Sequence, residues 1–126
     1  MSNNNQREPE ALLPLTPAVF HILLALADGG KHGYAIMQEI GERTGGAMRM
    51  RPGTLYGSIQ RMLKDGLIVE TRGHSEPAHG EERRRYYGLT GFGLRVVQAE
   101  ARRLEQLVRV AQSKQVLPGL SPMGGA

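Results

Sequence analysis

Hydrophobic residues recur at the spacing of a helix in two segments near the start of the chain. In the first segment, Thr16 and Pro17 suit a helix cap and a first helical position, and a Gly-Gly pair suits the end. In the second, Ile36 and Ile40 mark an inward face, and Tyr34 is also placed inward. The pattern predicts two consecutive short helices.

A third helix is predicted over residues 52–65. Leu55, Ile59 and Met62 follow one another at spacings of four and three, so they share one face. An Asp-Gly pair at the end of this segment is typical of a helix stop. The third helix is therefore amphipathic, with one apolar face for a core.

After the third helix the period of the pattern shortens. Residues 67–73 are partly β-branched, and residues 83–90 alternate in the way that strands do. The polar stretch between these segments contains Pro77 and Gly80, which predicts a β-hairpin with a long loop. Thr90 then suits the cap of a last helix that runs to about residue 116.

Three short helices, a hairpin and a long helix form a mainly α fold with a small β-hairpin, the winged helix-turn-helix. We expect this domain at 12–89 and a C-terminal dimerisation helix at 90–116. The polar residues 1–11 and the Gly- and Pro-rich residues 117–126 are expected to be disordered. In such a fold the third helix lies in the major groove of DNA and the hairpin loop contacts the backbone.

The exposed face of the third predicted helix suits a nucleic acid. Gly57 costs a helix about 1 kcal/mol relative to Ala, which a merely solvated surface would not recover. Glycine does allow close approach to another molecule's backbone. Arg51 is a poor N-cap, so a DNA phosphate could bond the first N–H groups. The residues of this segment expected to face DNA are Arg51, Gly53, Gly57, Gln60, Arg61 and Lys64. The alternative is a helix face that is only solvated.

The second predicted strand carries the densest basic cluster of the chain. Alternation in a strand places one of Tyr86 and Tyr87 inward and turns the Arg side chains on the outer edge towards phosphates. The alternative is a charged hairpin that is only solvated. A metal site is not expected in the hairpin loop, because its histidines match no standard ligand spacing. The hairpin residues expected to contact DNA are Arg72, His74, Arg83, Arg84 and Arg85.

The last predicted helix carries an apolar heptad stripe, with Glu100 among the residues of its polar coat. A helix so long and regular suits a seam with a second copy, and packing within one chain is the alternative. A two-fold dimer would place two third helices about 34 Å apart, which predicts an inverted-repeat target. The residues of the expected seam are Leu94, Val97, Ala101, Leu104, Val108 and Ala111.

Composition narrows the classes of function. The net charge of +4 favours a polyanionic partner weakly, and the absence of Cys excludes disulfides and zinc sites built on thiolates. Neither a membrane span nor a signal-peptide pattern is found, so we expect a cytoplasmic protein without membrane contact. No phosphate-binding loop and no His-Glu-x-x-His motif occur. We therefore expect no catalysis, no cofactor and no metal.

Three blocks of the chain resemble the signature blocks of PadR-type transcriptional regulators. They are HGYAIMQEI at 32–40, PGTLYGSIQRMLKDGLI at 52–68 and RRRYYGLTGFG at 83–93. The matching region spans residues 15 to about 112. The resemblance implies a winged-helix dimer that represses or otherwise regulates transcription and is often tuned by a small ligand.

Individual positions also match the family's pattern. Tyr34, Thr54 and Tyr56 match family residues near the DNA backbone, and Arg61 matches the basic residue of the reading helix. Gly57 departs from the pattern, since it stands where the family often has Pro, so the DNA sequence that is read could differ. The chain has no Trp, which argues against the pocket for flat drugs found in some members.

We therefore expect a sequence-specific, DNA-binding transcriptional regulator, with repression favoured over activation. Its expected partners are double-stranded DNA and a second copy of itself, on an inverted-repeat operator. Release by a small-molecule effector is a tendency of the family that no residue here demonstrates. The alternative is a winged helix that binds proteins and not DNA. Such a module would lack basic residues on its third helix and hairpin, and this chain has them on both.

Overall fold

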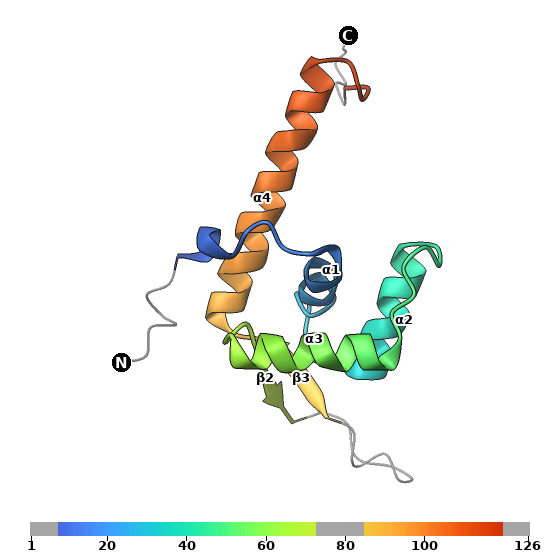
Figure 1. The fold of residues 1–126 in the computed structure, drawn as a ribbon, viewed down its shortest axis with the longest axis vertical. Coiled ribbons are helices and arrows are strands. Elements are labelled where there is room, and N and C mark those ends of the chain that lie inside the picture. The colour runs from blue at the N-terminus through green and yellow to red at the C-terminus, as the bar shows by residue number, and fades with distance from the viewer. Residues whose placement is uncertain (1–7, 73–84, 120–126) are drawn as a thin grey trace.

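The computed structural model describes residues 8–72 and 85–119. In Figure 1, α3 runs across a compact head, α4 rises away from it, and the β2–β3 hairpin projects from the opposite end. Within the described residues the elements are the 3-10 helix η2 (Pro9–Leu12), the α-helices α1 (Pro17–Ala25), α2 (Gly33–Arg43), α3 (Pro52–Lys64) and α4 (Gly91–Ser113), and the strands β1 (Lys31–His32), β2 (Ile68–Thr71) and β3 (Tyr86–Leu89).

The predicted starts of α1, α3 and α4 are confirmed, whereas α1 ends at Ala25, before the expected Gly-Gly stop, and α4 ends at Ser113, before the expected residue 116. The Thr16 hydroxyl accepts a hydrogen bond from the N–H of Val19 at 3.2 Å, which caps α1. Thr90 caps α4 in the same way, through a 2.9 Å bond from the N–H of Gly93. Gly66, just after α3, has a φ of +78°, a conformation that favours glycine over other residues. Local sequence signals thus set the limits of the long helices.

The sheet has one strand more than the predicted hairpin. Its order is β1–β3–β2, and both pairings are antiparallel. Tyr87 of β3 pairs with Glu70 of β2 on one side and with Lys31 of β1 on the other. Strand β1 has only two residues, too few to show a period, and its pairing with β3 joins segments far apart in the chain.

One hydrophobic core joins the helices to the sheet. Leu55, Ile59 and Met62 of α3 are buried, as the spacing predicted, and Tyr87 is the inward tyrosine of β3 with 2% exposure. The remaining core comes from α1, α2, the sheet and the first half of α4, through Ile22, Leu23, Ala25, Leu26, Ile36, Ile40, Leu67, Ile68, Phe92, Val96 and Val97. Helices α2 and α3 with the β2–β3 hairpin form a winged helix-turn-helix, the predicted fold class.

The N-terminal segment and Glu100 differ from expectation. Residues 9–11 were expected within a disordered segment, but together with Leu12 they form η2, which contacts α4. Glu100, expected on a polar surface, is only 2% exposed. Its carboxylate accepts hydrogen bonds from the N–H of Leu15 at 3.1 Å and from Arg103 at 2.6 Å. These bonds explain how the carboxylate can be buried, because each oxygen has a donor.

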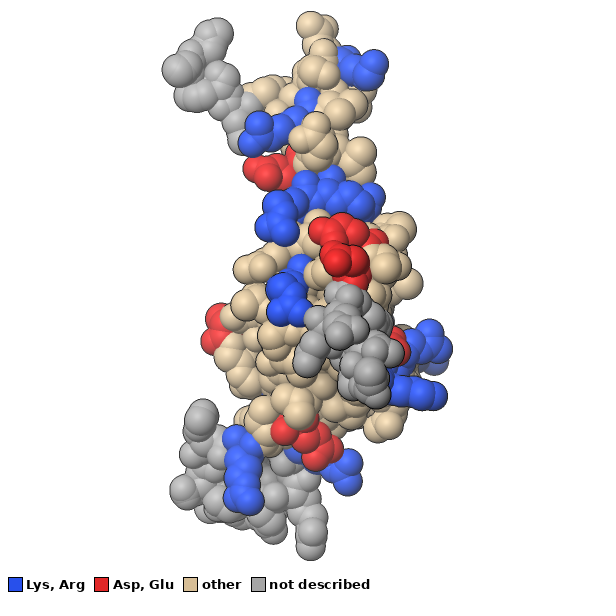
Figure 2. Space-filling view, turned by 90° about the vertical axis from the view of Figure 1, so that its left-hand side faces the viewer, with Lys and Arg blue, Asp and Glu red and all other residues tan. Residues whose placement is uncertain are grey.

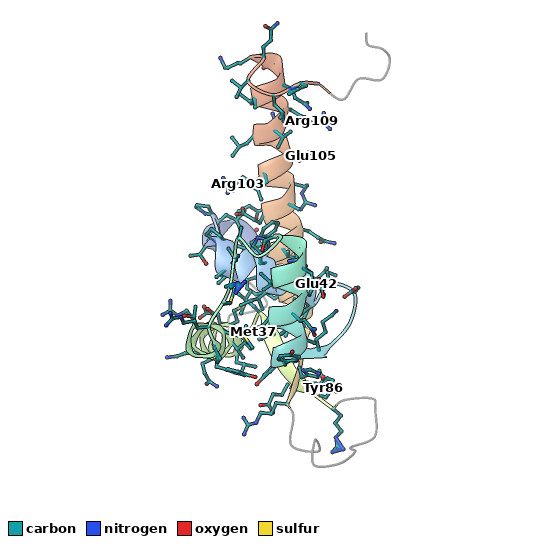
Figure 3. All side chains as sticks on the ribbon, turned by 90° about the vertical axis from the view of Figure 1, so that its right-hand side faces the viewer. Met37, Glu42, Tyr86, Arg103, Glu105 and Arg109 are labelled. Carbon is teal, nitrogen blue, oxygen red and sulfur yellow. The ribbon has the colours of Figure 1, made fainter. Side chains whose placement is uncertain are left out.

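Helix α4 has two parts with different surroundings. Phe92, Val96 and Val97 pack into the head, whereas beyond Glu100 most side chains are exposed. Figure 3 shows Arg103, Glu105 and Arg109 on the part of α4 that rises above the head. None of the helices in the described ranges is long and apolar enough to cross a membrane.

Candidate nucleic-acid interface

The outward face of α3 is open and has little side-chain cover. Leu55, Ile59 and Met62 fix the helix to the core, so its opposite face points away from the head. A Cβ added at Gly53 or Gly57 would meet no atom within 4 Å. The residues that line a shallow, open depression on this face are Gly57, Gln60, Arg61, Leu63 and Lys64. The face is therefore shaped for contact with a large surface rather than for enclosing a small molecule.

The residues expected to face DNA are exposed wherever the structure describes them. One detail of the prediction was wrong. The helical pattern also placed the Tyr34 side chain inward, but this side chain is 58% exposed. His74, Arg83 and Arg84 lie outside the described residues. The exposed members of the set are Tyr34, Arg51, Gly53, Thr54, Tyr56, Gly57, Gln60, Arg61, Lys64, Arg72 and Arg85. Their exposure leaves them available, and their contact with DNA stays a prediction.

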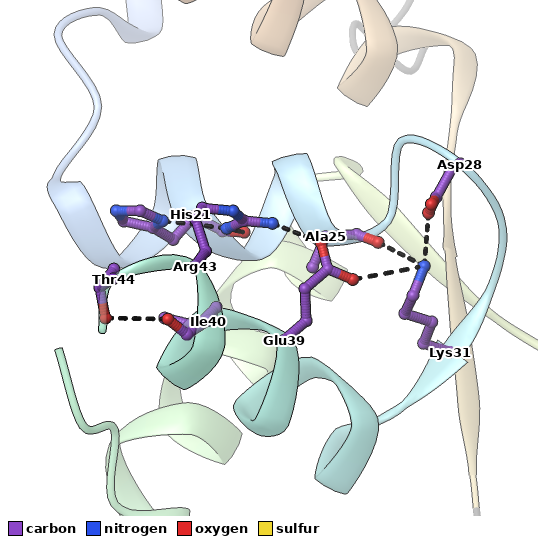
Figure 4. Close-up of polar contacts among 8 residues, drawn as sticks. All are labelled: His21, Ala25, Asp28, Lys31, Glu39, Ile40, Arg43 and Thr44. Carbon is purple, nitrogen blue, oxygen red and sulfur yellow. Dashed lines mark hydrogen bonds and ion pairs between the residues drawn. The ribbon is translucent and has the colours of Figure 1, made fainter. Parts of the chain in front are cut away.

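Cations between α1 and α2 are neutralised by nearby carboxylates. Lys31 lies 3.8 Å from Glu39 and donates a hydrogen bond to the carbonyl of Ala25 at 2.7 Å (Figure 4). Arg43 pairs with the same Glu39 and also bonds Nδ1 of His21 at 3.0 Å. Burial first, and then the charge of Arg43, lower the pKa of His21. This network joins α1 to α2 and leaves little free charge between them.

Four cations on α3 or near the hairpin have no such partner in the described parts of the chain. Among the described residues, no ion pair engages Arg51, Arg61, Lys64 or Arg72. Arg49, which sequence reasoning did not single out, lies just before Arg51 and is also exposed, and no ion pair within residues 8–72 and 85–119 engages it. Figure 2 shows further basic side chains around the α4 stalk, where acidic ones lie among them. The unbalanced positive charge on and beside α3 is what a polyanion would neutralise.

The start of α3 is suited to an anion. Arg51 occupies the N-cap and makes no side-chain cap hydrogen bond, as the sequence predicted. Pro52 follows at the first helical position, and no acidic residue stands in the first turn. The helix dipole and the Arg51 guanidinium both favour a negative group at this end.

An aromatic cluster links α2 to the hairpin, and the sequence did not reveal it. The ring of His32 stacks on Tyr34 at a centroid distance of 6.4 Å and meets Tyr86 edge-on at 5.3 Å. Nδ1 of His32 also accepts a hydrogen bond from the N–H of Ala35 at 3.2 Å, which caps α2. The one local signal for this cluster is the order Lys-His-Gly-Tyr, in which a His stands immediately before the start of a helix.

The expected dimer seam on α4 is divided between core and surface. Val97 is 4% exposed and packs into the head of its own chain. Leu94 and Val108 are 42% and 43% exposed, and Ala101 is also exposed. Leu104 and Ala111 are half-buried. The upper part of α4 adds the exposed apolar residues Leu107 and Val110 outside the strict seam, and Val116 and Leu117, just after the end of α4, are also exposed.

Comparison with known proteins gives one family. The model of the transcriptional regulator PadR-like family matches residues 22–99. The chain is 36% identical over 106 residues to the transcriptional regulator Rv3488 of Mycobacterium tuberculosis, a match that covers 83% of this chain and 87% of that protein. A further match, 35% identical over 86 residues and 68% of the chain, is to an uncharacterized 37.1 kDa protein in transposon TN4556 of Streptomyces fradiae. The chain spans 22% of that longer protein.

The fold is also similar to a solved structure. A crystal structure of a PadR family transcription regulator from Clostridium difficile superposes with a TM-score of 0.66. The two chains are 23% identical, and the superposition covers 79% of this chain and 99% of that one. At this level of identity the likeness concerns the fold alone.

Proposed function

The chain belongs to the PadR-like family of transcriptional regulators, and from this premise we propose that it binds double-stranded DNA in a sequence-specific manner. The observation that carries the proposal is the outward face of α3, where glycines and unpaired cations stand together. Gly57 faces open space, and Arg61 and Lys64 have no acidic partner among the described residues. A protein-binding module would have no need for this combination.

The two parts of the interface would have different tasks. Gln60 and Arg61 on α3 would reach base edges, where an amide suits adenine and a guanidinium suits guanine. Arg51, Lys64 and Arg72 would contact phosphates, which supply affinity and hold α3 in register without reading sequence. Because Gly57 has no side chain, α3 could approach the DNA backbone closely at this position.

We further propose that the regulator acts as a homodimer on an inverted repeat. The exposed apolar residues on the upper part of α4, among them Leu104, Leu107 and Val108, support a two-fold seam between copies. Two copies of α3 would then meet successive major-groove faces about 34 Å apart. Bound in this way, the dimer would cover an operator, which favours repression. Release by a small-molecule effector rests only on the tendency of PadR-type regulators.

The proposal is tested by selecting bound duplexes from a random pool and then measuring affinity by fluorescence anisotropy. We expect one inverted repeat to be enriched. Affinity for it should fall about a thousandfold between 50 and 200 mM salt if at least six phosphates are contacted. A pool without enrichment, together with affinity that does not change with salt, would contradict DNA binding and favour a protein-interaction module.

A further inference from the structure

An acidic side chain stands on the hairpin among the cations proposed to meet DNA. Glu70 of β2 is 48% exposed, and its Oε2 lies 3.3 Å from Nη1 of Arg85, whose side chain is 68% exposed. Arg85 is one of the basic residues expected to contact phosphates, and it is bound here by a carboxylate. Figure 2 shows acidic and basic side chains next to each other at the lower end of the molecule, the end from which the hairpin projects.

The pairing of the strands places Glu70 on the side of the sheet that faces α3. Residues directly opposite in an antiparallel ladder point to the same side, and Glu70 is paired with the buried Tyr87. Burial, then the charge of Glu70, and then Tyr56 raise the pKa of the Tyr87 hydroxyl. Tyr87 also belongs to the same core as Leu55, Ile59 and Met62, and α3 contacts β2, so this side of the sheet faces α3. The carboxylate is therefore beside the surface that the proposed DNA would cover.

We propose that Glu70 is a positioning residue that restrains the hairpin's affinity for DNA by holding Arg85 along the strand. This inference rests on the DNA binding proposed above. An exposed ion pair of this kind is weak, so a phosphate can exchange with the carboxylate for Arg85. Breaking the pair offsets part of what Arg85 gains from the phosphate, so the contact adds less to binding than a guanidinium without a carboxylate partner would add. The effect is the same for every DNA sequence, because phosphates carry no sequence information.

A restrained hairpin has a consequence for regulation. Because the opposing charge acts on backbone contacts, it weakens cognate and random duplexes alike and shortens the lifetime of both complexes. Retention at an operator then depends more strongly on the base contacts of α3. A regulator that must dissociate from its operator benefits from such a limit on its affinity for the DNA backbone.

The test compares Glu70→Gln with the wild-type protein on a cognate and a random duplex, by anisotropy at several salt concentrations. We expect Glu70→Gln to bind both duplexes about fivefold more tightly, with a slope of log affinity against log salt steeper by about one. The double variant Glu70→Gln/Arg85→Gln should lose the gain, since the gain requires the freed guanidinium.

The chain offers a matched control in Glu105→Gln. Glu105 and Arg109 on α4 form a pair at the same 3.3 Å, with exposures of 62% and 68%, but Figure 3 places them far from Tyr86 on the hairpin. We expect this variant to match wild type in affinity and salt slope, with the oligomeric state of every variant checked by sedimentation. A similar gain in Glu105→Gln, or a gain that persists in the double variant, would overturn the role of Glu70.

The two proposals fail in different ways. If wild type binds DNA and Glu70→Gln binds with the same affinity and slope, only the restraint by Glu70 is wrong. If wild type binds no duplex even at 50 mM salt, the proposed DNA binding is wrong and this inference falls with it.

Discussion

The hydroxyl of Tyr56 on α3 lies against Gly33 at the start of α2, in the space that a Cβ at residue 33 would occupy. Gly33 is buried and Tyr56 is 42% exposed, so the contact joins the interior of the helix-turn-helix to the surface that we propose to face DNA. The absence of a side chain at one residue thus determines where an exposed aromatic ring of the neighbouring helix can lie.

Gly33→Ala should displace Tyr56 and weaken DNA binding. A methyl group added to a close contact costs about 1–3 kcal/mol, and we expect the lower end because the Tyr56 hydroxyl can swing towards solvent. Gly41→Ala is the control, since a Cβ there meets nothing within 4 Å and Ala is the better helix former by about 0.5–1 kcal/mol. Urea unfolding and duplex anisotropy measure both effects. Equal stability gains in the two variants would contradict the steric role of Gly33.

Gly57→Ala should make the protein more stable and a poorer DNA binder. Nothing lies within 4 Å of an added Cβ, so the free energy of unfolding should rise by about 1 kcal/mol. Against a closely apposed DNA backbone the same methyl group should lower affinity at least about tenfold. Gly41→Ala should give a similar stability gain with unchanged affinity. If both variants bind like wild type, close approach at Gly57 is not the reason for this glycine.

The α-helices and the two strands of the hairpin could be predicted from the sequence, because residues within or next to each element mark it. Thr16, Gly66 and Thr90 mark helix ends through their own hydrogen bonds or backbone angles, so the α-helices and the hairpin strands could be placed from the order of residues alone. The apolar spacing of Leu55 and Ile59 likewise fixed the buried and open faces of α3, and thereby the exposed members of the candidate site.

Features that depend on distant segments could not be predicted. Strand β1 exists only because Lys31 and His32 find partners in β3, more than fifty residues later. The burial of Glu100 depends on the N–H of Leu15, eighty-five residues away, and on a helix face that only the folded head covers. In the sequence alone Glu100 cannot be distinguished from Glu105, the exposed acidic residue of the same helix.

Arg61→Ala should weaken operator binding and relax base preference. A guanidinium that reads a base contributes about 1–3 kcal/mol of discrimination, whereas a phosphate contact weakens all sequences equally. Arg102→Ala is the control, because Arg102 is also exposed and without an ion pair in the described structure but lies on α4. Repeating the duplex selection with each variant measures the change. Unchanged selectivity in Arg61→Ala would remove this residue from base reading.

Glu100→Gln should reduce the loss of stability at acid pH, so that the free energy of unfolding depends less on pH. The hydrogen-bonded Arg103 is the main cause that lowers the pKa of Glu100 in the folded protein, and the N–H of Leu15 acts in the same direction. The unfolded carboxyl takes up its proton near pH 4.3, so the stabilisation is complete above that pH and is lost as pH falls through the lower folded value.

Urea unfolding of wild type and Glu100→Gln between pH 3 and 7 measures this difference. We expect a deficit of about 1–3 kcal/mol at pH 7 that shrinks as pH falls below about 4.3, because the unfolded wild-type carboxyl takes up a proton there and the folded carboxyl does so only at lower pH. Glu105→Gln serves as control, since its exposed pair contributes little. Parallel curves for wild type and Glu100→Gln would show that the buried pair does not shape the pH dependence.

Leu104→Glu should convert a homodimer into monomers. Leu104 is half-buried in the single chain and lies at the centre of the apolar stripe of α4, so a second copy would enclose the new carboxylate without a partner. Gln106→Glu adds the same charge two residues later, at the heptad position farthest from the stripe, and should leave the dimer intact. Sedimentation velocity over a range of concentrations distinguishes the two variants. If Leu104→Glu still sediments as a dimer, the copies meet through another surface, and the spacing of two α3 helices along DNA must follow from that surface instead.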